Sequence, residues 1–458
     1  KGEHRINAHV VEADDSGVDL VCSSKLPENN SERRIRIKAT SNSGFVDALN
    51  TRFKKLYFGY ENTTIRLTDE LPDNISFIYG PPGTGKTTEV VNRICNLVDL
   101  NDDVKILVLT PTNRAADEVA ERLCKRLDLN ANVSRYGVTE SDDLVENHFE
   151  SLKNRTTMFL AEDSSDVVVT TIARYPYDSM NNGIPIFDLK WDVIIVDEAS
   201  MIDVVPITLL LINNKADKFI IAGDPMQIKP VTPENVTERN IYDMVGLSSF
   251  KKAIEGKCKY PVDILDTQHR SVSIIGNMVS QFAYDGKLKN DINRQPHKVL
   301  QLPGLQVSTV NTIGYSVEEM GLLYGFNPVE KSSVHIYSAV FAYEFAKYIA
   351  NTVKVSHSDI DYTIGIVSPY GKQADAIKQM LEASPIDTSN CKVKCGTVHK
   401  FQGGECDIMI VVMNYPSTNS GWNANINKQN IMNVAMSRAK DYVFFLMPLV
   451  PLENSKDK

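Results

Sequence analysis

Residues 75–98 read ISFIYGPPGTGKTTEVVNRICNLV, and the organisation of the whole chain can be worked outward from them. The run ISFIY is short, apolar and rich in β-branched residues, which predicts a buried strand. The segment after the loop places Val90, Val91, Ile94, Leu97 and Val98 on one helical face. The stretch therefore predicts a strand, a glycine-rich loop and a helix, in that order.

The loop GPPGTGKT, residues 80–87, has the composition of a phosphate cradle. Glycines let backbone N–H groups turn toward an anion, and the helix N-terminus adds the positive end of its dipole. We expect Lys86 to reach the β- and γ-phosphates of a nucleoside triphosphate and the Thr87 hydroxyl to ligate Mg²⁺. The strand and helix on either side argue against a chance match. The predicted nucleotide contacts are Gly80, Pro81, Pro82, Gly83, Thr84, Gly85, Lys86, Thr87 and Thr88.

Short β-branched runs then alternate with helical stretches in two series. The first series has strand-like runs at 75–79, 104–110, 167–171, 192–198 and 219–223. The second has them at 363–368, 393–398, 407–413 and 442–447, separated by helical segments such as 339–353 and 370–382. This alternation predicts an α/β fold with two tandem units, each built on a parallel sheet. We predict the units at 66–258 and 259–458.

Residues 1–65 differ from the rest of the chain. The runs HVVEA (9–13), VDLVCSS (18–24) and RRIRIKA (33–39) are short, alternating and separated by turn residues. This pattern predicts a small β-rich accessory module, and a small barrel would fit it.

Two further strand ends carry polar residues that suit phosphate chemistry. In VIIVDEAS, Asp197 and Glu198 follow four apolar residues, where a carboxylate is costly unless it serves a cation or a water. We expect Asp197 to hold the Mg²⁺ shell and Glu198 to polarise the attacking water. A solvated turn is the alternative for the pair taken alone. In FIIAGDPMQIKP, Gln227 lies at the same predicted sheet edge, where it can sense the γ-phosphate.

The second unit supplies two candidate arginines, Arg270 in LDTQHRS and Arg438 in NVAMSRAK. Guanidinium groups delivered from a second lobe can neutralise charge on a transferring phosphoryl group, which couples hydrolysis to closure. Surface ion pairing is the alternative for either arginine considered singly.

The order of the motifs resembles superfamily 1 helicases, in the branch of the nonsense-mediated-decay helicase and its DNA- and RNA-acting relatives. The resemblance covers Ile75 to Pro448. It rests on GPPGTGKT, LTPTNRAADEV, VVTTIAR, VDEAS, GDPMQIKP, LDTQHRS, IGIVSPYGKQ, GTVHKFQGGECDIMIV and NVAMSRAK. It implies two RecA-like domains that hydrolyse ATP with Mg²⁺ and move along single-stranded DNA or RNA from 5′ to 3′.

The resemblance also implies roles for residues that match the family pattern. Glu405 would contact the nucleotide ribose, with Gly403 and Gly404 allowing close approach, and His269 stands where relatives often carry a tyrosine that stacks on the base. The strand-gripping positions would be Thr110, Pro111, Thr112, Asn113, Thr170 and Thr171 from the first lobe, and Ser368, Pro369, Tyr370, Thr397 and His399 from the second. Hydroxyls and main-chain groups can hold a phosphate backbone. The alternative is that the threonines only complete strands.

The chain departs from the family pattern in two further places. Upstream of the glycine-rich loop there is no Asn-x-x-Gln element of the kind that relatives use to read adenine. Asn430 and Ile431 stand where relatives usually carry a pair of arginines. The sequence therefore leaves the preference for ATP over other nucleotides open.

Composition limits the remaining possibilities. The 458 residues carry 49 Lys and Arg against 58 Asp and Glu, a net charge of -9, which argues against passive coating of a polyanion. Seven scattered cysteines favour a reducing compartment, cytoplasmic or nuclear. No apolar run predicts a membrane span. The chain starts at Lys1, and flanking domains or protein partners outside it are left open.

These features leave three functions to distinguish. The first is a nucleic-acid-stimulated ATPase and helicase. The second is a nucleotide-gated clamp or remodelling ATPase that does not unwind processively, suggested by the acidic balance and by the short segments between motifs. The third, a P-loop kinase or small GTPase, does not account for a second α/β unit.

Overall fold

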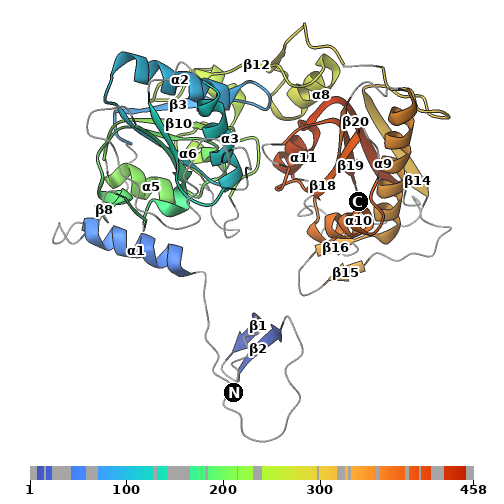
Figure 1. The fold of residues 1–458 in the computed structure, drawn as a ribbon, viewed down its shortest axis with the longest axis horizontal. Coiled ribbons are helices and arrows are strands. Elements are labelled where there is room, and N and C mark those ends of the chain that lie inside the picture. Colours follow the sequence, from blue (N-terminus) through green and yellow to red (C-terminus); the bar gives the residue numbers. More distant parts are fainter. Residues whose placement is uncertain are drawn as a thin grey trace, which may run out of the picture.

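The computed structural model describes most of the two predicted units and part of the N-terminal module. The described residues are 8–14, 17–22, 43–57, 71–126, 131–139, 141, 144, 166–176, 178–180, 184–213, 215–230, 240–296, 299–316, 325–327, 332–356, 361–386, 391–401, 404–413 and 428–449. They form two α/β lobes, each built on a parallel sheet (Figure 1). The predicted fold class is therefore confirmed. Within these ranges, no helix has the length and apolar character needed to cross a membrane.

The first lobe contains a seven-stranded sheet in the order β11-β3-β10-β9-β4-β6-β5, and every neighbouring pair is parallel. Its strands are β3 (Ile75–Tyr79), β4 (Lys105–Thr110), β5 (Asn132–Arg135), β6 (Asp166–Thr171), β9 (Trp191–Val196), β10 (Ala216–Gly223) and β11 (Val262–Ile264). The five strands predicted for this unit are all present.

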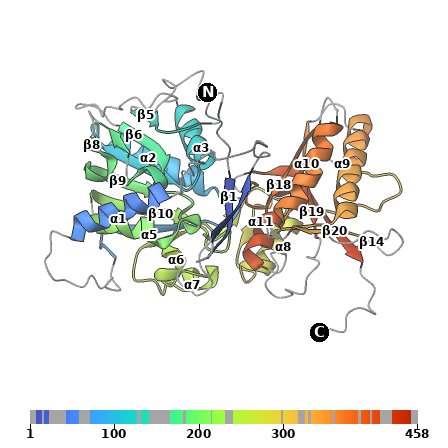
Figure 2. The ribbon, with the colours of Figure 1, turned by 90° about the horizontal axis from the view of Figure 1, so that it is seen from below.

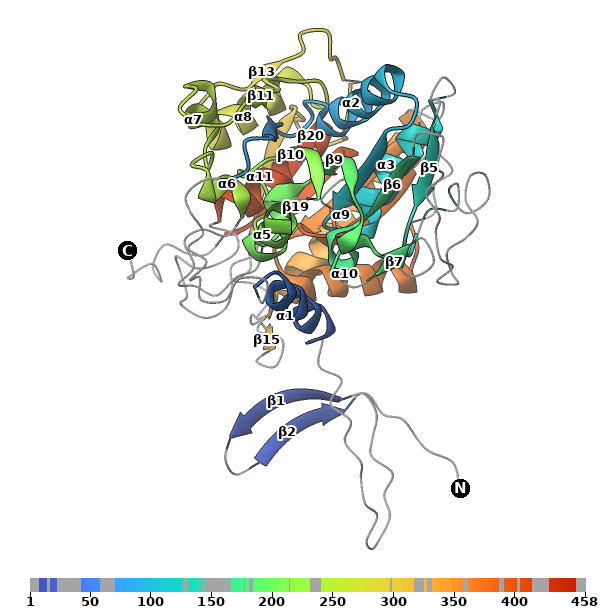
Figure 3. The ribbon, with the colours of Figure 1, turned by 90° about the vertical axis from the view of Figure 1, so that its left-hand side faces the viewer.

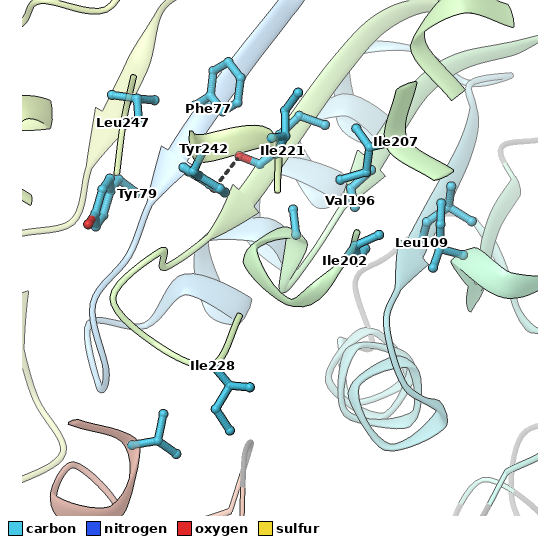
Figure 4. Packing of buried hydrophobic residues seen from close by; sticks show 14 of the residues in the cluster. Phe77, Tyr79, Leu109, Val196, Ile202, Ile207, Ile221, Ile228, Tyr242 and Leu247 are labelled. Carbon is cyan, nitrogen blue, oxygen red and sulfur yellow. Dashed lines mark hydrogen bonds between the residues drawn. The ribbon is translucent and has the colours of Figure 1, made fainter. Parts of the chain in front are cut away.

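Helices cover both faces of this sheet because its strands are apolar on both sides. On one face, Ile78 and Ile106 pack with α2 (Lys86–Leu100) and α3 (Asn113–Cys124). On the other face lie α5 (Val204–Asn213), α6 (Ile241–Met244) and α7 (Phe250–Ile254). Figure 4 shows Ile221 and Val196 of this second face beside Tyr242 and Ile207. Both faces of the sheet are covered by apolar side chains, so the polar functional groups lie at the ends of the strands.

The second lobe contains a five-stranded parallel sheet in the order β14-β20-β19-β17-β18. Its strands are β14 (Val310–Ser316), β17 (Tyr362–Ser368), β18 (Cys391–Thr397), β19 (Cys406–Val412) and β20 (Ala439–Leu449). Its helices are α8 (Ser273–Ala283), α9 (Ile336–Ser356), α10 (Gly371–Ala383) and α11 (Gln429–Met436). The four strands and two helical segments predicted for this unit are confirmed.

The two faces of the second sheet have different partners. The face that includes Ile364 and Ile408 packs on α9 and α10. The face that includes Met409 and Val411 packs with α8 and α11 and joins the apolar cluster that continues into the first lobe. Figure 2 shows α8 and α11 on the side of the second sheet that faces the first lobe, and α9 and α10 on the far side. The lobes therefore meet through α8 and α11.

Three two-stranded sheets accompany the lobes. β12 (Thr267–Gln268) pairs with β13 (Lys289–Asn290), close to the join between the lobes. The other two are β7 (Ser179–Met180) with β8 (Ile184–Pro185), and β15 (Gly325–Asn327) with β16 (Ser332–Val334). The join itself differs from the predicted boundary at 258, because β11 pairs with β3 and so belongs to the first sheet.

The N-terminal module contains two of its three predicted strands. β1 (Ala8–Asp14) and β2 (Gly17–Cys22) form an antiparallel hairpin that lies apart from both lobes in Figures 1 and 3, whereas the run 33–39 lies outside the described residues. The module also contains a helix that the strand pattern did not predict, α1 (Ser43–Tyr57). This helix packs against α5 and buries Leu49 in the core of the first lobe. Part of the module is thus bound to that lobe.

Candidate active site

The glycine-rich loop connects β3 to α2 and has a backbone conformation that requires glycine. Gly83 and Gly85 have φ angles of 73° and 83°, in the left-handed region that other residues avoid. A Cβ atom at Gly83 would also lie 2.7 Å from Cβ of Arg270, a residue beyond the first lobe's last strand. Gly85 precedes the first turn of α2, and its carbonyl accepts from the N–H of Glu89 at 2.8 Å. The predicted order of strand, loop and helix is present.

Lys86, from this loop, meets the predicted catalytic carboxylate. Its Nζ lies 2.8 Å from Oε1 of Glu198, and both side chains are largely buried. Burial lowers the pKa of Lys86, but the carboxylates of Glu198 and Asp197 outweigh it and hold the pKa above its ordinary value. Burial raises the pKa of Glu198, but Lys86, together with Arg438 and Arg270, outweighs that effect and holds the pKa below its ordinary value. Both groups are therefore charged at neutral pH.

The Thr87 hydroxyl donates to Oδ2 of Asp197 at 3.3 Å. A threonine hydroxyl and a carboxylate side by side are hard oxygen donors of the kind that Mg²⁺ prefers, so the residues fit the predicted ion. Burial, with the like charge of Glu198, raises the pKa of Asp197 to about 6. A divalent cation would offset this cost, because it favours the charged form of a carboxylate.

Glu198 has an unusual backbone. Its φ of 53° and ψ of 35° lie in the left-handed region. A residue with a Cβ atom pays about 1 kcal/mol or more for this conformation. Its second carboxylate oxygen, Oε2, is buried and accepts no hydrogen bond from the described residues. Strain and an unsatisfied buried acceptor both carry a free-energy cost, and such costs collect at sites where a ligand or water is handled. This is consistent with the predicted water-polarising role.

The two predicted γ-phosphate contacts from different lobes touch each other. Arg438, which follows α11, donates from Nη2 to Oε1 of Gln227 at 2.8 Å. Gln227 in turn donates from Nε2 to Oδ2 of Asp224 at 2.9 Å. Burial, with the like charge of Arg270, lowers the pKa of Arg438. The structure therefore brings a second-lobe guanidinium to the end of a first-lobe strand, as the motif order predicts.

Arg270 lies at the edge of the same site. Its Nε donates to Oε2 of Glu405 at 2.8 Å, and its Nη1 donates to the carbonyl of Ser437 at 3.2 Å. Lys440 also pairs with Glu405, at 2.7 Å. Burial raises the pKa of Glu405, but the two cations outweigh it and hold the pKa below its ordinary value. Arg270 and Glu405, predicted separately, thus form one ion pair beside the glycine-rich loop.

His269 contacts the site through its backbone. Its N–H donates to the carbonyl of Gly83 at 2.8 Å, while the imidazole is 58% exposed and its Nδ1 lies 3.0 Å from Asp291. The ring is therefore accessible at the edge of the loop, and its stacking on a nucleotide base stays a prediction. Gly403 lies outside the described residues.

The predicted strand-gripping residues lie at the carboxyl ends of parallel strands in both lobes. Thr110 ends β4, Thr171 ends β6, Ser368 ends β17 and Thr397 ends β18. Pro369 and Tyr370 follow β17, and Tyr370 is buried. Ligands of open α/β sheets collect at such ends. In both lobes, the predicted strand-gripping residues therefore lie at the sheet edge formed by the carboxyl ends of the strands.

Exposure separates these residues into two groups. Thr112 and His399 are exposed, and Pro111, Asn113 and Thr397 are half-buried. Thr110 and Thr170 are fully buried, and their hydroxyls donate to backbone carbonyls within the lobe. The strand-completing role considered for the threonines therefore suits these two. The exposed residues remain candidates for contact.

The site also contains buried polar residues that sequence reasoning missed. Tyr284 and Asn433 are both fully buried, and they connect Asp224 to the second lobe. Asn433 is the first residue of NVAMSRAK, a motif considered only for its arginine. Tyr284 directly follows the apolar helix α8 and carries no local signal that distinguishes it from a core residue.

Comparison with known proteins gives two family models that match this chain. Both are described as an AAA domain, and they match residues 64–233 and 245–447. Together they account for most of the chain.

Curated relatives include the 5'-3' DNA helicase ZGRF1 of Mus musculus, 27% identical over 299 residues, which cover 63% of this chain and 14% of the relative. Helicase SEN1 of Saccharomyces cerevisiae is 23% identical over 299 residues, 64% of this chain and 12% of the relative. The DNA replication ATP-dependent helicase/nuclease dna2 of Schizosaccharomyces pombe is 27% identical over 401 residues, 80% of this chain and 26% of the relative. The chain thus spans between 12% and 26% of these three proteins.

Among solved structures, the chain is similar to the helicase nonstructural protein 10 of an arterivirus. The TM-score is 0.42 at 12% identity, over 99% of this chain and 73% of the viral one.

Proposed function

This chain belongs to superfamily 1 of the helicases, in the branch of the nonsense-mediated-decay helicase, and from that membership we propose that it hydrolyses ATP between its lobes to move along single-stranded nucleic acid. The observation that carries the proposal is the 2.8 Å contact between Arg438 of the second lobe and Gln227 of the first. A guanidinium in that position can act on a phosphoryl group only when the lobes are closed. Hydrolysis and lobe movement are thereby coupled.

The first step is nucleotide binding. Lys86 leaves Glu198 and binds the β- and γ-phosphates, while the glycine-rich loop and the N-terminus of α2 hold the phosphate oxygens. Thr87 and Asp197 would hold Mg²⁺, which supplies charge neutralisation across the phosphates when bound. Glu405 and His269 lie where ribose and base contacts are expected.

The second step is hydrolysis. Glu198, released from Lys86, has both carboxylate oxygens available to orient a water toward the γ-phosphorus. Gln227 contacts the same water or the γ-phosphate, and Arg438 and Arg270 offset the charge that develops on the transferring group. Loss of the γ-phosphate removes the anion that these arginines share with Lys86, and the lobes can then separate.

The grip on nucleic acid completes the proposal. We propose that the strand lies across the carboxyl ends of β4 and β6 in one lobe and β17 and β18 in the other, held by Thr112, Asn113, Thr397 and His399. The same proposal divides the chain into an accessory module, a first lobe that includes β11, and a second lobe. A mouse relative named as a 5'-3' DNA helicase supports movement from 5′ to 3′.

The test is the ATPase rate of the purified chain with and without single-stranded DNA and RNA of matched sequence. We expect either nucleic acid to stimulate hydrolysis. The Lys86→Ala protein is the control, because any ATPase activity in its preparation comes from contaminating enzymes. A folded wild-type chain that neither nucleic acid stimulates would refute the proposal.

A strand-displacement assay on tailed duplexes separates the helicase from the clamp. Stimulated hydrolysis without displacement on either tail polarity favours the clamp. Displacement on only one tail polarity also gives the direction of movement.

A further inference from the structure

Tyr284 occupies a position between the lobes that no part of the proposed reaction has yet used. It directly follows the last residue of α8, is fully buried, and packs edge-to-face on Phe250 with ring centroids 5.6 Å apart. Its hydroxyl donates to Oδ2 of Asp224 at 2.7 Å and accepts from Nδ2 of Asn433 at 2.8 Å. A tyrosine hydroxyl can do both at once, because it is donor and acceptor together. It therefore links the two lobes.

Asp224 accepts hydrogen bonds from both Tyr284 and Gln227 and so connects the two side chains. The carboxylate is fully buried and accepts from Tyr284, from Nε2 of Gln227 at 2.9 Å and from the N–H of Met226 at 3.0 Å. An ionised carboxylate only accepts, so Gln227 must turn its NH₂ group toward it. The amide oxygen of Gln227 is then the atom left to face Arg438.

Asn433, from the second lobe, donates hydrogen bonds to both Tyr284 and the loop that contains Gln227. Besides the Tyr284 hydroxyl, its Nδ2 donates to the carbonyl of Met226 at 2.8 Å. Asn433 lies on α11, and Arg438 follows the same helix. The loop from Asp224 to Gln227 is thus held by one second-lobe segment at two points. A change in lobe spacing must act on both points together.

We propose that Tyr284 is a positioning residue: held between Asn433 and Asp224, its hydroxyl keeps Gln227 oriented for the γ-phosphate and for Arg438. The proposal rests on the proposed ATPase function. It predicts that the hydroxyl affects turnover and not the binding of ATP, because within the described part of the chain Tyr284 makes no hydrogen bond to the glycine-rich loop or to Lys86.

A tyrosine that only fills the core would behave differently, and the chain offers a matched control. Tyr242 is also fully buried in the first lobe, and its hydroxyl donates to the backbone carbonyls of Ile78 at 2.9 Å and Ile221 at 3.2 Å. Tyr242→Phe and Tyr284→Phe make the same chemical change at similar depth. Only the second removes a hydrogen bond to Asp224.

The experiment measures kcat and KM for ATP at saturating single-stranded nucleic acid. Hydrogen bonds to charged groups are worth enough to change a rate by about 10- to 100-fold, and we expect that loss in kcat for Tyr284→Phe. The KM for ATP should change less than about 3-fold, and Tyr242→Phe should keep kcat within about 3-fold of wild type. Both variants retain the ring, and circular dichroism with urea unfolding checks the fold.

A double-mutant cycle tests whether Tyr284 acts through Gln227. If it does, Tyr284→Phe combined with Gln227→Ala should be no slower than Gln227→Ala alone, within about 2-fold. Asn433→Ala provides a second route, because it removes the other partner of the hydroxyl, and its loss should also vanish in the Gln227→Ala background. If Tyr284→Phe does not fold, a loss for Asn433→Ala that persists in the Gln227→Ala background overturns the inference.

The outcomes are distinct. A wild-type chain that hydrolyses ATP, with Tyr284→Phe as active as Tyr242→Phe, overturns the inference and leaves the proposed function intact. Losses that multiply in the double variants also overturn it, since Tyr284 would then act independently of Gln227. A wild-type chain without ATPase activity overturns both the inference and the proposed function.

Discussion

The Glu198→Gln substitution separates two roles that the structure gives to one carboxylate. The change removes a negative charge and keeps the shape of the side chain. Oε1 of Glu198 pairs with Nζ of Lys86 at 2.8 Å, and Oε2 is buried without a hydrogen-bond donor among the described residues. The first oxygen therefore competes with phosphate for Lys86, and the second is available to a water.

The magnitudes follow from these two contacts. Loss of a positioned general base costs about 10²- to 10⁴-fold, and we expect kcat to fall by about 10³-fold, equivalent to about 4 kcal/mol. A hydrogen bond between two charged groups exceeds one with a neutral partner by about 1.5 kcal/mol. Lys86 is therefore easier to detach from Gln than from Glu, and ATP should bind about 10-fold more tightly.

The assay combines single-turnover hydrolysis with equilibrium binding of a fluorescent ATP analogue. Asp217→Asn is the matched control, because it makes the same carboxylate-to-amide change at an exposed position whose one ion pair among the described residues is with Lys190, at 3.4 Å. Both quantities should remain at wild-type values in the control.

Two outcomes would contradict these roles of Glu198. Hydrolysis by Glu198→Gln at the wild-type rate would show that the water is activated elsewhere. Binding of the analogue that weakens by 10-fold or more, on the order of the predicted gain, would show that Glu198 supports the nucleotide instead of competing with it.

Three further predictions concern charge in the first lobe. Lys86→Ala should abolish measurable binding of the fluorescent analogue, because the triphosphate loses its principal cation and Glu198 is left uncompensated beside it; binding as tight as wild type would contradict this. Burial raises the pKa of Asp224 to about 6, and the hydrogen bonds from Tyr284 and Gln227 need its ionised form. The kcat should therefore fall as the pH is lowered from about 7.5 to about 5.5, and a flat profile at saturating ATP would exclude this role. Arg135→Ala should lower the free energy of unfolding by about 3 to 5 kcal/mol, since it removes a buried guanidinium 2.7 Å from Asp117. Urea unfolding measures this loss. The control is Lys190→Ala, which removes an exposed ion pair and should lower the free energy of unfolding by less than about 1 kcal/mol. Equal losses in the two variants would contradict the prediction.

Features that depend on neighbours along the chain could be predicted from the amino-acid sequence. The apolar strand at Ile75–Tyr79, the glycines of the loop and the helical face after Lys86 are all local patterns, and the structure has them as predicted. Strand ends gave the positions of Asp197 and Glu198, because in a parallel sheet the carboxyl ends share one edge. Those residues lie together beside Lys86.

The contacts between polar groups that are distant in sequence became known from the three-dimensional fold. The contact between Gln227 and Arg438 joins residues 211 positions apart, and the motif order predicted the meeting of the lobes but not the atoms involved. It also decided that Thr110 is buried and Thr112 exposed, although both belong to one polar motif. Helix α1 was missed because residues 1–65 were interpreted as one β-rich unit, although Phe45, Leu49 and Phe53 are spaced four residues apart on one helical face and pack on the first lobe.

Tyr284 shows the physical reason for this division most clearly. In sequence it is one aromatic residue at the end of an apolar helix, where burial is the ordinary expectation. Its function depends on partners 60 and 149 positions away, whose approach is set by the packing of α8 and α11 between two sheets. Periodicity reports which face of an element is apolar, whereas the pairing of buried hydrogen-bonding groups depends on distances that exist only after the lobes have folded.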